Sequence, residues 1–130
     1  MLSHLLKKLF GKAKPDFAVK LDQAAANEQI RQILRKHGDD GSTLRTVEHF
    51  AYPSKSGEGA EASAVEALLK QFGFATKPAV QDGGLIAEHE SAVAAGEFDL
   101  FTTRVAAAIG ELGWDYDGWG CPVVTRKENS

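Results

Sequence analysis

Two Glu-His pairs are the residues of this sequence whose types could support acid–base or metal chemistry. They are Glu48-His49 and Glu88-His89. Zinc takes imidazole nitrogens and carboxylate oxygens as ligands, and both groups can transfer protons. Because successive residues of a strand point to opposite faces, each pair divides its members between the two faces of a sheet. At most the two histidines or the two glutamates can converge, and cross-strand hydrogen bonds and salt links are the favoured interpretation.

Motifs that define known classes of enzyme are missing from the sequence. It has no nucleophile elbow, no phosphate-binding loop and no HExxH, and Gly83-Gly84 falls in a predicted hairpin turn. Cys121 is the single cysteine, which excludes an intrachain disulfide and a multi-cysteine metal site. We therefore predict no enzyme activity, no cofactor and no metal. A small metal-dependent or acid–base enzyme that uses the Glu-His pairs is the alternative.

The segment WDYDGWG, residues 114–120, has the most unusual composition in the chain. Three aromatic residues, two aspartates and two glycines occupy its seven positions. Trp and Tyr provide large contact areas, and glycine allows backbone conformations that other residues avoid. Two interpretations carry equal weight: a bulged strand whose rings fill the core, and a protein interface, where aromatic residues are enriched.

Hydrophobic periodicity predicts the elements that position these residues. Helical spacing occurs over residues 22–37, 64–72 and 98–112, and each run is followed by a glycine. Strands are predicted over 43–52, 74–80, 85–93 and 114–124, with a bulge or break near Asp117 and Gly118 in the last.

The order of these elements from residue 43 onward is strand, helix, strand, strand, helix, strand. It predicts an α+β fold, a ferredoxin-like sandwich with two helices on one face of a four-stranded antiparallel sheet. One or two extra N-terminal helices precede it. In this topology strands 43–52 and 85–93 are neighbours at the centre of the sheet.

Charge divides the chain into a basic arm, residues 1–20, and an acidic domain, residues 21–130. The arm has five lysines and one aspartate, whereas the remainder has ten basic and seventeen acidic residues. Such a domain repels nucleic acid and attracts a basic partner, so no direct nucleic-acid binding is predicted. Residues 2–10 have the spacing of a short amphipathic helix. We favour a packed terminal helix over a membrane-surface or partner-docking arm, because so short a helix binds a bilayer weakly.

The length of 130 residues and the hydrophobic share of 43% are those of one ordinary globular domain. No apolar stretch approaches the roughly 18 residues of a membrane-spanning helix. Lys7 and Lys8 interrupt the apolar residues near the start, so we expect no export signal. A cytoplasmic protein is predicted.

Three segments resemble a known family: GDDGSTLRTVEHFAYP at 38–53, FGF at 72–74 and WDYDGWG at 114–120. The family is the bacterial inhibitors of ribonuclease E called regulator of ribonuclease E activity B, and the resemblance extends from about Ile30 to Val124. It implies a ferredoxin-like fold and a regulator that binds ribonuclease E, or a related RNA-processing enzyme, and restrains RNA decay by protein contact. An acidic domain suits this role, because the non-catalytic region of that enzyme is rich in arginine and complementary charge orients docking.

The resemblance also implies which residues bind the partner, and none of them is predicted to be catalytic. We expect docking through the acidic surface and the edge around Trp119. Self-association, in which the sheet face is buried against a second copy as a homodimer, is a further alternative. The predicted partner-binding residues are Asp40, Arg45, Glu48, His49, Glu90, Tyr116, Asp117, Gly118 and Trp119.

Overall fold

The computed structural model describes residues 23–125, which form three helices and a four-stranded antiparallel sheet. The predicted helix at 2–10 and the whole of the predicted arm, residues 1–20, lie outside the described residues. No helix within 23–125 is long and apolar enough to cross a membrane. In chain order the elements are α2 (Gln23–Lys36), β1 (Arg45–Pro53), α3 (Ala62–Gln71), β2 (Ala75–Pro78), β3 (Leu85–Ser91), α4 (Glu97–Glu111) and β4 (Trp114–Gly120).

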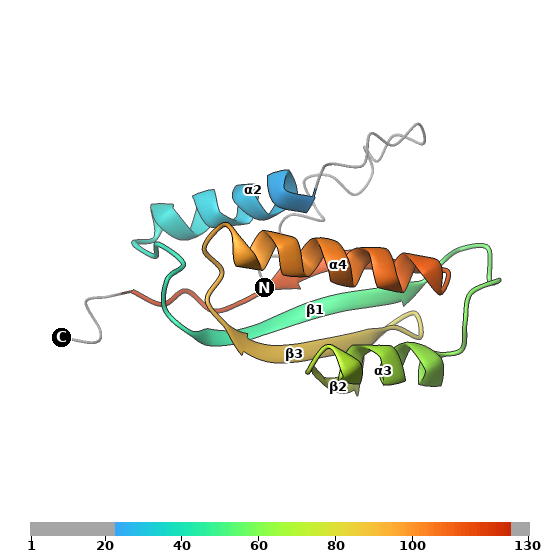
Figure 1. The fold of residues 1–130 in the computed structure, drawn as a ribbon. Helices are drawn as coiled ribbons and strands as arrows, with labels where there is room; N and C mark the ends of the chain where they lie inside the picture. Colours follow the sequence, from blue (N-terminus) through green and yellow to red (C-terminus); the bar gives the residue numbers. More distant parts are fainter. Residues whose placement is uncertain (1–22, 126–130) are drawn as a thin grey trace.

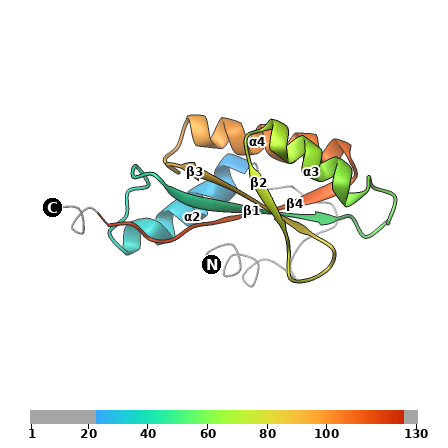
Figure 2. The same cartoon turned by 90° about the horizontal axis from the view of Figure 1, so that it is seen from below.

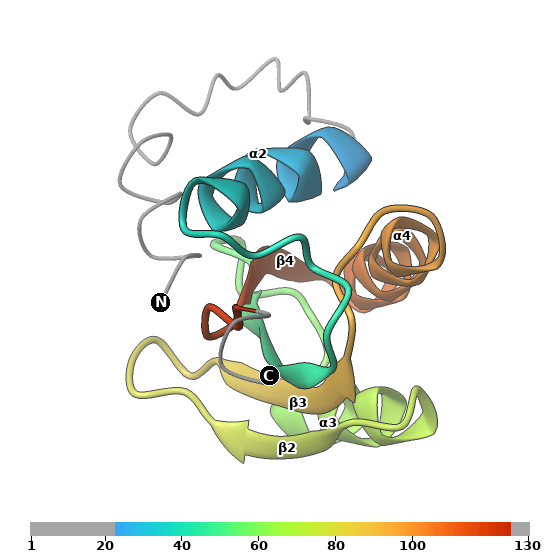
Figure 3. The ribbon, with the colours of Figure 1, turned by 90° about the vertical axis from the view of Figure 1, so that its left-hand side faces the viewer.

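The strands lie in the order β2-β3-β1-β4, and each neighbouring pair is antiparallel. β1 and β3 are therefore the two central strands, which confirms their predicted pairing. Helices α3 and α4 lie on the same side of the sheet (Figure 1), and α2 lies beside β4 (Figure 3). We call the opposite side, which no helix of residues 23–125 covers, the open face (Figure 2).

Two clusters of buried side chains form the core. The larger joins α3 and the C-terminal half of α4 to the helix-covered face of the sheet, and the smaller joins α2 to β1, β4 and the start of α4. Trp119 belongs to this second cluster, and its ring packs edge-on against Phe98 with a centroid distance of 4.8 Å. A second core lets the extra helix bury its own apolar stripe, Ile30 and Leu34, against the sheet domain.

Polar contacts fix where α2 sits on this second core. The Asn27 side-chain amide donates to Asp99 at 2.8 Å and to Thr102 at 2.9 Å, while its oxygen accepts from the Trp119 indole at 2.8 Å. Arg31 holds the same Asp99 carboxylate with two hydrogen bonds of 2.9 and 3.0 Å. Because these groups are largely buried, each needs its partner, and the network specifies one position for α2.

A β-bulge in β4 confirms the predicted irregularity near Gly118. His49 pairs with Trp119 and Ala51 pairs with Tyr116, so β4 has one more residue than β1 between these two pairs. Gly118 lies in the bulge with φ 96°, a conformation that favours glycine. Without the extra residue, Tyr116 and Trp119 would point to opposite faces, and the bulge places both on the helix-covered face.

β4 ends at Gly120, four residues earlier than predicted. Pro122 has no amide hydrogen, so it cannot continue the ladder. The chain beyond β4 bonds instead to a buried ion pair: the Val124 amide donates to Asp39 at 2.9 Å, and Arg45 donates to the Pro122 carbonyl at 3.3 Å.

Candidate functional site

The two histidines of the Glu-His pairs meet on the helix-covered face. His49 lies opposite Ala87 and His89 lies opposite Val47, so the histidines are diagonal neighbours across β1 and β3. Their Nε2 atoms are 2.9 Å apart, and Nδ1 of His49 is 2.7 Å from the Tyr116 hydroxyl oxygen. The three side chains form one hydrogen-bonded chain across β3, β1 and β4.

Aromatic rings enclose this chain and keep it uncharged. His89 stacks on Phe101 with a centroid distance of 5.1 Å and packs edge-on against Phe74 at 4.8 Å. Burial, with a smaller contribution from His89, lowers the pKa of His49 to about 3; burial also lowers the pKa of His89 and raises that of Tyr116. Both imidazoles are therefore neutral near pH 7. Each hydrogen bond of this chain has one donor and one acceptor if the Tyr116 hydroxyl donates to His49 and His49 donates to His89.

His89 also borders an open pocket of about 490 Å³ between β3 and α4. Its walls include Phe72 and Phe101, and Arg104 stands beside it. Within residues 23–125 no group of three or more His, Cys, Asp or Glu side chains is placed to hold a metal ion. The histidine pair offers its Nε2 atoms to each other, and the arrangement that it makes is a cross-strand hydrogen bond.

The two glutamates of the pairs meet on the open face. Glu48 lies directly opposite Glu88, where two negative charges would repel each other. Lys77 from β2 relieves this repulsion, because its Nζ lies 2.9 Å from Glu88 Oε1 and 3.2 Å from Glu48 Oε2. The hydrogen bonds that Lys77 donates, first to Glu88 and then to Glu48, raise the pKa of Lys77. Glu90, two residues along β3, is exposed and accepts a hydrogen bond from the Thr46 hydroxyl.

The rest of the open face combines an apolar centre with more carboxylates. Strand alternation places Phe50 and Tyr52 of β1 on this face, and Phe50 lies opposite Ile86 of β3. Asp115 and Asp117 of β4 flank this centre. Lys77 is the one basic side chain that the four strands, as described, place on this face. The open face is thus an apolar strip bordered by carboxylates.

Arg45, a predicted binding residue, lies in the interior. It pairs with Asp39, and the side chain of each is only 1% exposed. Burial alone would raise the pKa of Asp39, but hydrogen bonds from Arg45 and from the amides of Val124 and Gly41 outweigh it and lower that pKa. This ion pair joins the loop after α2 to the segment after β4, so its observed contacts are structural.

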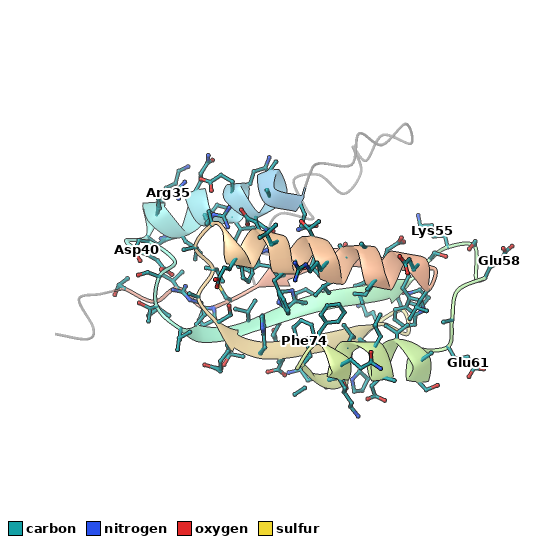
Figure 4. The ribbon with its side chains drawn as sticks, in the orientation of Figure 1. Arg35, Asp40, Lys55, Glu58, Glu61 and Phe74 are labelled. Atoms are coloured by element: carbon teal, nitrogen blue, oxygen red, sulfur yellow. The ribbon has the colours of Figure 1, made fainter. Side chains whose placement is uncertain are left out.

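The other predicted residues divide between interior and surface. Trp119 is fully buried and His49 is 2% exposed, so both lie beneath the surface. Tyr116 directs its hydroxyl to His49, and Gly118 forms the bulge. The structure brings Glu48, Glu90 and Asp117 together on the open face, whereas Asp40 lies in the loop after α2 (Figure 4).

Two residues of the open face, Glu88 and Lys77, are not in the predicted set. Lys77 lies on a short strand of four residues, and only the pairing of β2 with β3 brings its ammonium between the two glutamates. The signal for Glu88 is the repeated Glu-His pair, because strand alternation allows Glu48 and Glu88 to converge on one face.

A family model described as regulator of ribonuclease activity B matches residues 24–121. The chain belongs to this family. The match runs from α2 to the residue after β4, so it includes the histidine chain, the open face and the bulge. It confirms the resemblance carried by the three sequence segments. A comparison with curated proteins found no match. Membership of the regulator of ribonuclease activity B family assigns the chain to regulators of ribonuclease activity.

Proposed function

We propose that this protein is a non-catalytic regulator that binds a ribonuclease through the open face. The resemblance implies ribonuclease E, or a related RNA-processing enzyme, as the partner. The observation that carries the proposal is the row of carboxylates from Glu48, Glu88 and Glu90 beside an apolar strip, on a face without a covering helix in residues 23–125. Complementary charge would steer and orient an arginine-rich partner segment toward it.

We also infer that the domain is the ferredoxin-like sandwich predicted from the element order. The strand order β2-β3-β1-β4 and the placement of α3 and α4 on one face support this assignment. A sandwich of this kind leaves one sheet face uncovered by its own two helices. That face is the one to which we assign partner binding.

Lys77 supplies an internal example of the contact that we propose. Its ammonium lies between Glu48 and Glu88 at 3.2 and 2.9 Å. An arginine or lysine of a partner would find a single exposed carboxylate at Glu90, which lies opposite Thr46 near the end of β3. Charge-assisted hydrogen bonds of this kind are stronger than neutral ones.

Charge reversal on the open face provides the first test. We expect Glu90→Lys to weaken binding to purified ribonuclease E about tenfold at low salt, because it replaces an attraction by a repulsion. Glu58→Lys makes the same change in net charge on the loop between β1 and α3 (Figure 4), and it should bind like the wild type. Surface-immobilised enzyme and label-free kinetics would measure both affinities, and cleavage of an RNA substrate would measure inhibition.

Two outcomes would contradict the proposal. Equal affinities for wild type, Glu90→Lys and Glu58→Lys would exclude the open face as the binding surface. RNA cleavage by the purified regulator alone would contradict a non-catalytic role. Trp119→Ala is unsuitable as a surface probe, because it removes a fully buried ring and so tests the fold.

A further inference from the structure

The pocket between β3 and α4 lies on the helix-covered side of the sheet, away from the face to which we assign partner binding. Its volume is about 490 Å³, which is in the range of sites for small organic molecules. None of the residues that line it is among the predicted partner-binding residues. The lining side chains include Phe72, His89, Glu97, Leu100, Phe101 and Arg104.

The hydrogen bonds of the histidine chain determine which nitrogen of His89 carries the proton. The Tyr116 hydroxyl points into the fold, 2.7 Å from His49 Nδ1, and within residues 23–125 its hydrogen has an acceptor only if it donates to His49. His49 then has its own proton on Nε2 and donates to His89 Nε2 at 2.9 Å. A neutral His89 is left with its proton on Nδ1.

This Nδ1–H group of His89 is a donor that is accessible from the pocket. It has no hydrogen-bond acceptor within residues 23–125. In the same part of the chain, Gln29 Oε1 is the one buried side-chain nitrogen or oxygen atom without a partner, so His89 Nδ1 is not shielded from solvent. Because the half-buried His89 lines the pocket, a ligand bound there can accept a hydrogen bond from Nδ1–H.

Arg104 adds a positive charge to the same pocket. Its side chain is exposed, and it makes no ion pair within the described range 23–125. It follows Phe101 by about one turn of α4, and Phe101 stacks on His89 with a centroid distance of 5.1 Å. A guanidinium and an N–H donor that border one space favour anionic oxygen atoms, and a carboxylate offers two.

Apolar side chains line the rest of the pocket. Phe72 and Phe101 pack edge-on with a centroid distance of 6.0 Å, and Leu100 on the same helix is 62% exposed. Glu97 lies seven residues before Arg104 on the same side of α4, about 10 Å away along the helix axis. Its carboxylate would repel a second negative charge, so the pocket fits a ligand with one anionic end and an apolar body.

We propose that this pocket binds a small organic acid. Its carboxylate accepts hydrogen bonds from Arg104 and from Nδ1–H of His89. Its aromatic or branched aliphatic body packs on Phe72, Leu100 and Phe101, and the burial of this body adds to the affinity. The binding requires no ribonuclease, so it can be measured on the purified protein and its test is separate from that of the regulator role.

Calorimetric titration of the full chain with 3-phenylpropanoate tests the class of ligand, with 3-phenylpropanamide as the uncharged counterpart. We expect the acid to bind about tenfold more tightly than the amide, because only the acid offers an anionic acceptor to Arg104. Acetate lacks the apolar body and should bind about tenfold more weakly than 3-phenylpropanoate, or less tightly still. Equal affinities for acid and amide, or no binding of the acid at millimolar concentration, would overturn the proposal.

A charge-matched pair of variants tests the role of Arg104. Arg104→Gln should weaken binding of 3-phenylpropanoate about tenfold and leave binding of the amide unchanged. Lys55→Gln removes the same charge from the exposed loop between β1 and α3 (Figure 4), and it should bind the acid like the wild type. Equal losses in the two variants would reveal a general attraction by charge and overturn the site.

A second pair, at exposed positions where the fold tolerates change, tests the apolar wall. Leu100→Ser should weaken the acid and the amide alike by about threefold, because both lose apolar contact area. Val80 is 97% exposed in the turn between β2 and β3, so Val80→Ser should leave both affinities unchanged. An unchanged affinity of Leu100→Ser would exclude this wall from the site.

The imidazole nitrogen NMR signals of His89 test its role in the wild-type chain, without a substitution in the core. The free protein should carry the His89 proton on Nδ1, and 3-phenylpropanoate should shift the Nδ1 signal more than the Nε2 signal. A proton on Nε2 in the free protein, or an Nδ1 signal that saturating acid leaves unchanged, would overturn the proposal. Tighter binding of a short peptide that ends in phenylalanine than of 3-phenylpropanoate would assign the pocket to a protein terminus and overturn the assignment to a small acid.

Discussion

His49 uses both ring nitrogens inside the fold, on Tyr116 at 2.7 Å and on His89 at 2.9 Å. A buried imidazole in such a chain is favoured only when neutral, because charging it in an apolar surrounding is costly. The histidine pair is thus part of a buried hydrogen-bonded chain that joins β3, β1 and β4. The same residues then make the stability of the domain sensitive to pH.

We predict that the domain loses stability as the pH falls from about 6.5 toward 3. The pKa of His49 falls from 6.5 to about 3 on folding, so within this window the unfolded chain binds a proton that the folded chain does not. The loss for one such histidine is about 1.4 kcal/mol per pH unit. Above about pH 6.5 both states are neutral at this site and the contribution is complete.

Urea unfolding between about pH 7 and pH 5 measures this effect. Asp39 and Glu28, whose pKa values are lowered on folding, lose their contributions only at lower pH, so the window isolates the histidines. His49→Gln should flatten the profile, because it removes the buried imidazole whose pKa is lowered most clearly. A wild-type profile that is flat in this range would refute the prediction.

At the scale of the element, β4 shows how one extra residue decides which side chains enter the core. The bulge at Gly118 lets Tyr116 reach His49 and Trp119 reach Asn27 from the same strand face. The unusual composition of residues 114–120 follows from this geometry. Aromatic residues fill the core, aspartates face outward and a glycine occupies the bulge, so the core interpretation accounts for the rings.

Gly118→Ala should destabilise the domain by about 1–2 kcal/mol. A Cβ at this position would have no atom within 4 Å, so the cost comes from the backbone conformation with φ 96° and not from a clash. Gly110→Ala in α4 is the matched control: its Cβ also has open space, but the backbone is helical, so this variant should be neutral or more stable. Equal effects of the two variants in urea unfolding would argue against the strained bulge.

At the scale of the whole molecule, α2 belongs to the domain through one buried polar network. Asn27 connects α2 to Asp99 and Thr102 of α4 and to Trp119 of β4. Apolar packing of Ile30 and Leu34 supplies attraction without direction. The polar network fixes the position and orientation of α2, because a displaced helix would leave these buried groups unpaired.

We expect Asn27→Ala to cost about 2–3 kcal/mol of unfolding free energy, because it leaves the buried Trp119 indole without an acceptor. Hydrogen exchange should show the loss of protection concentrated in α2. Gln32→Ala, at an exposed position of the same helix, should change stability by less than about 0.5 kcal/mol. Unchanged protection of α2 in Asn27→Ala would show that apolar packing alone holds the helix.

The sequence by itself determined the order and type of the elements, the central pairing of two strands and the family. These properties depend on local periodicity, on glycine positions and on short motifs, and each of these can be recognised within a short segment of the sequence. The rule that only like members of the two Glu-His pairs can converge also came from local geometry, since it requires nothing more than strand alternation.

Only the tertiary structure decided which predicted residues are accessible. Arg45 and Trp119 have residue types common at interfaces, yet Asp39 and Asn27 hold them in the interior. The ammonium of Lys77 reaches Glu48 from two strands away. Burial and register arise from contacts between residues far apart in the chain, which residue types alone do not specify.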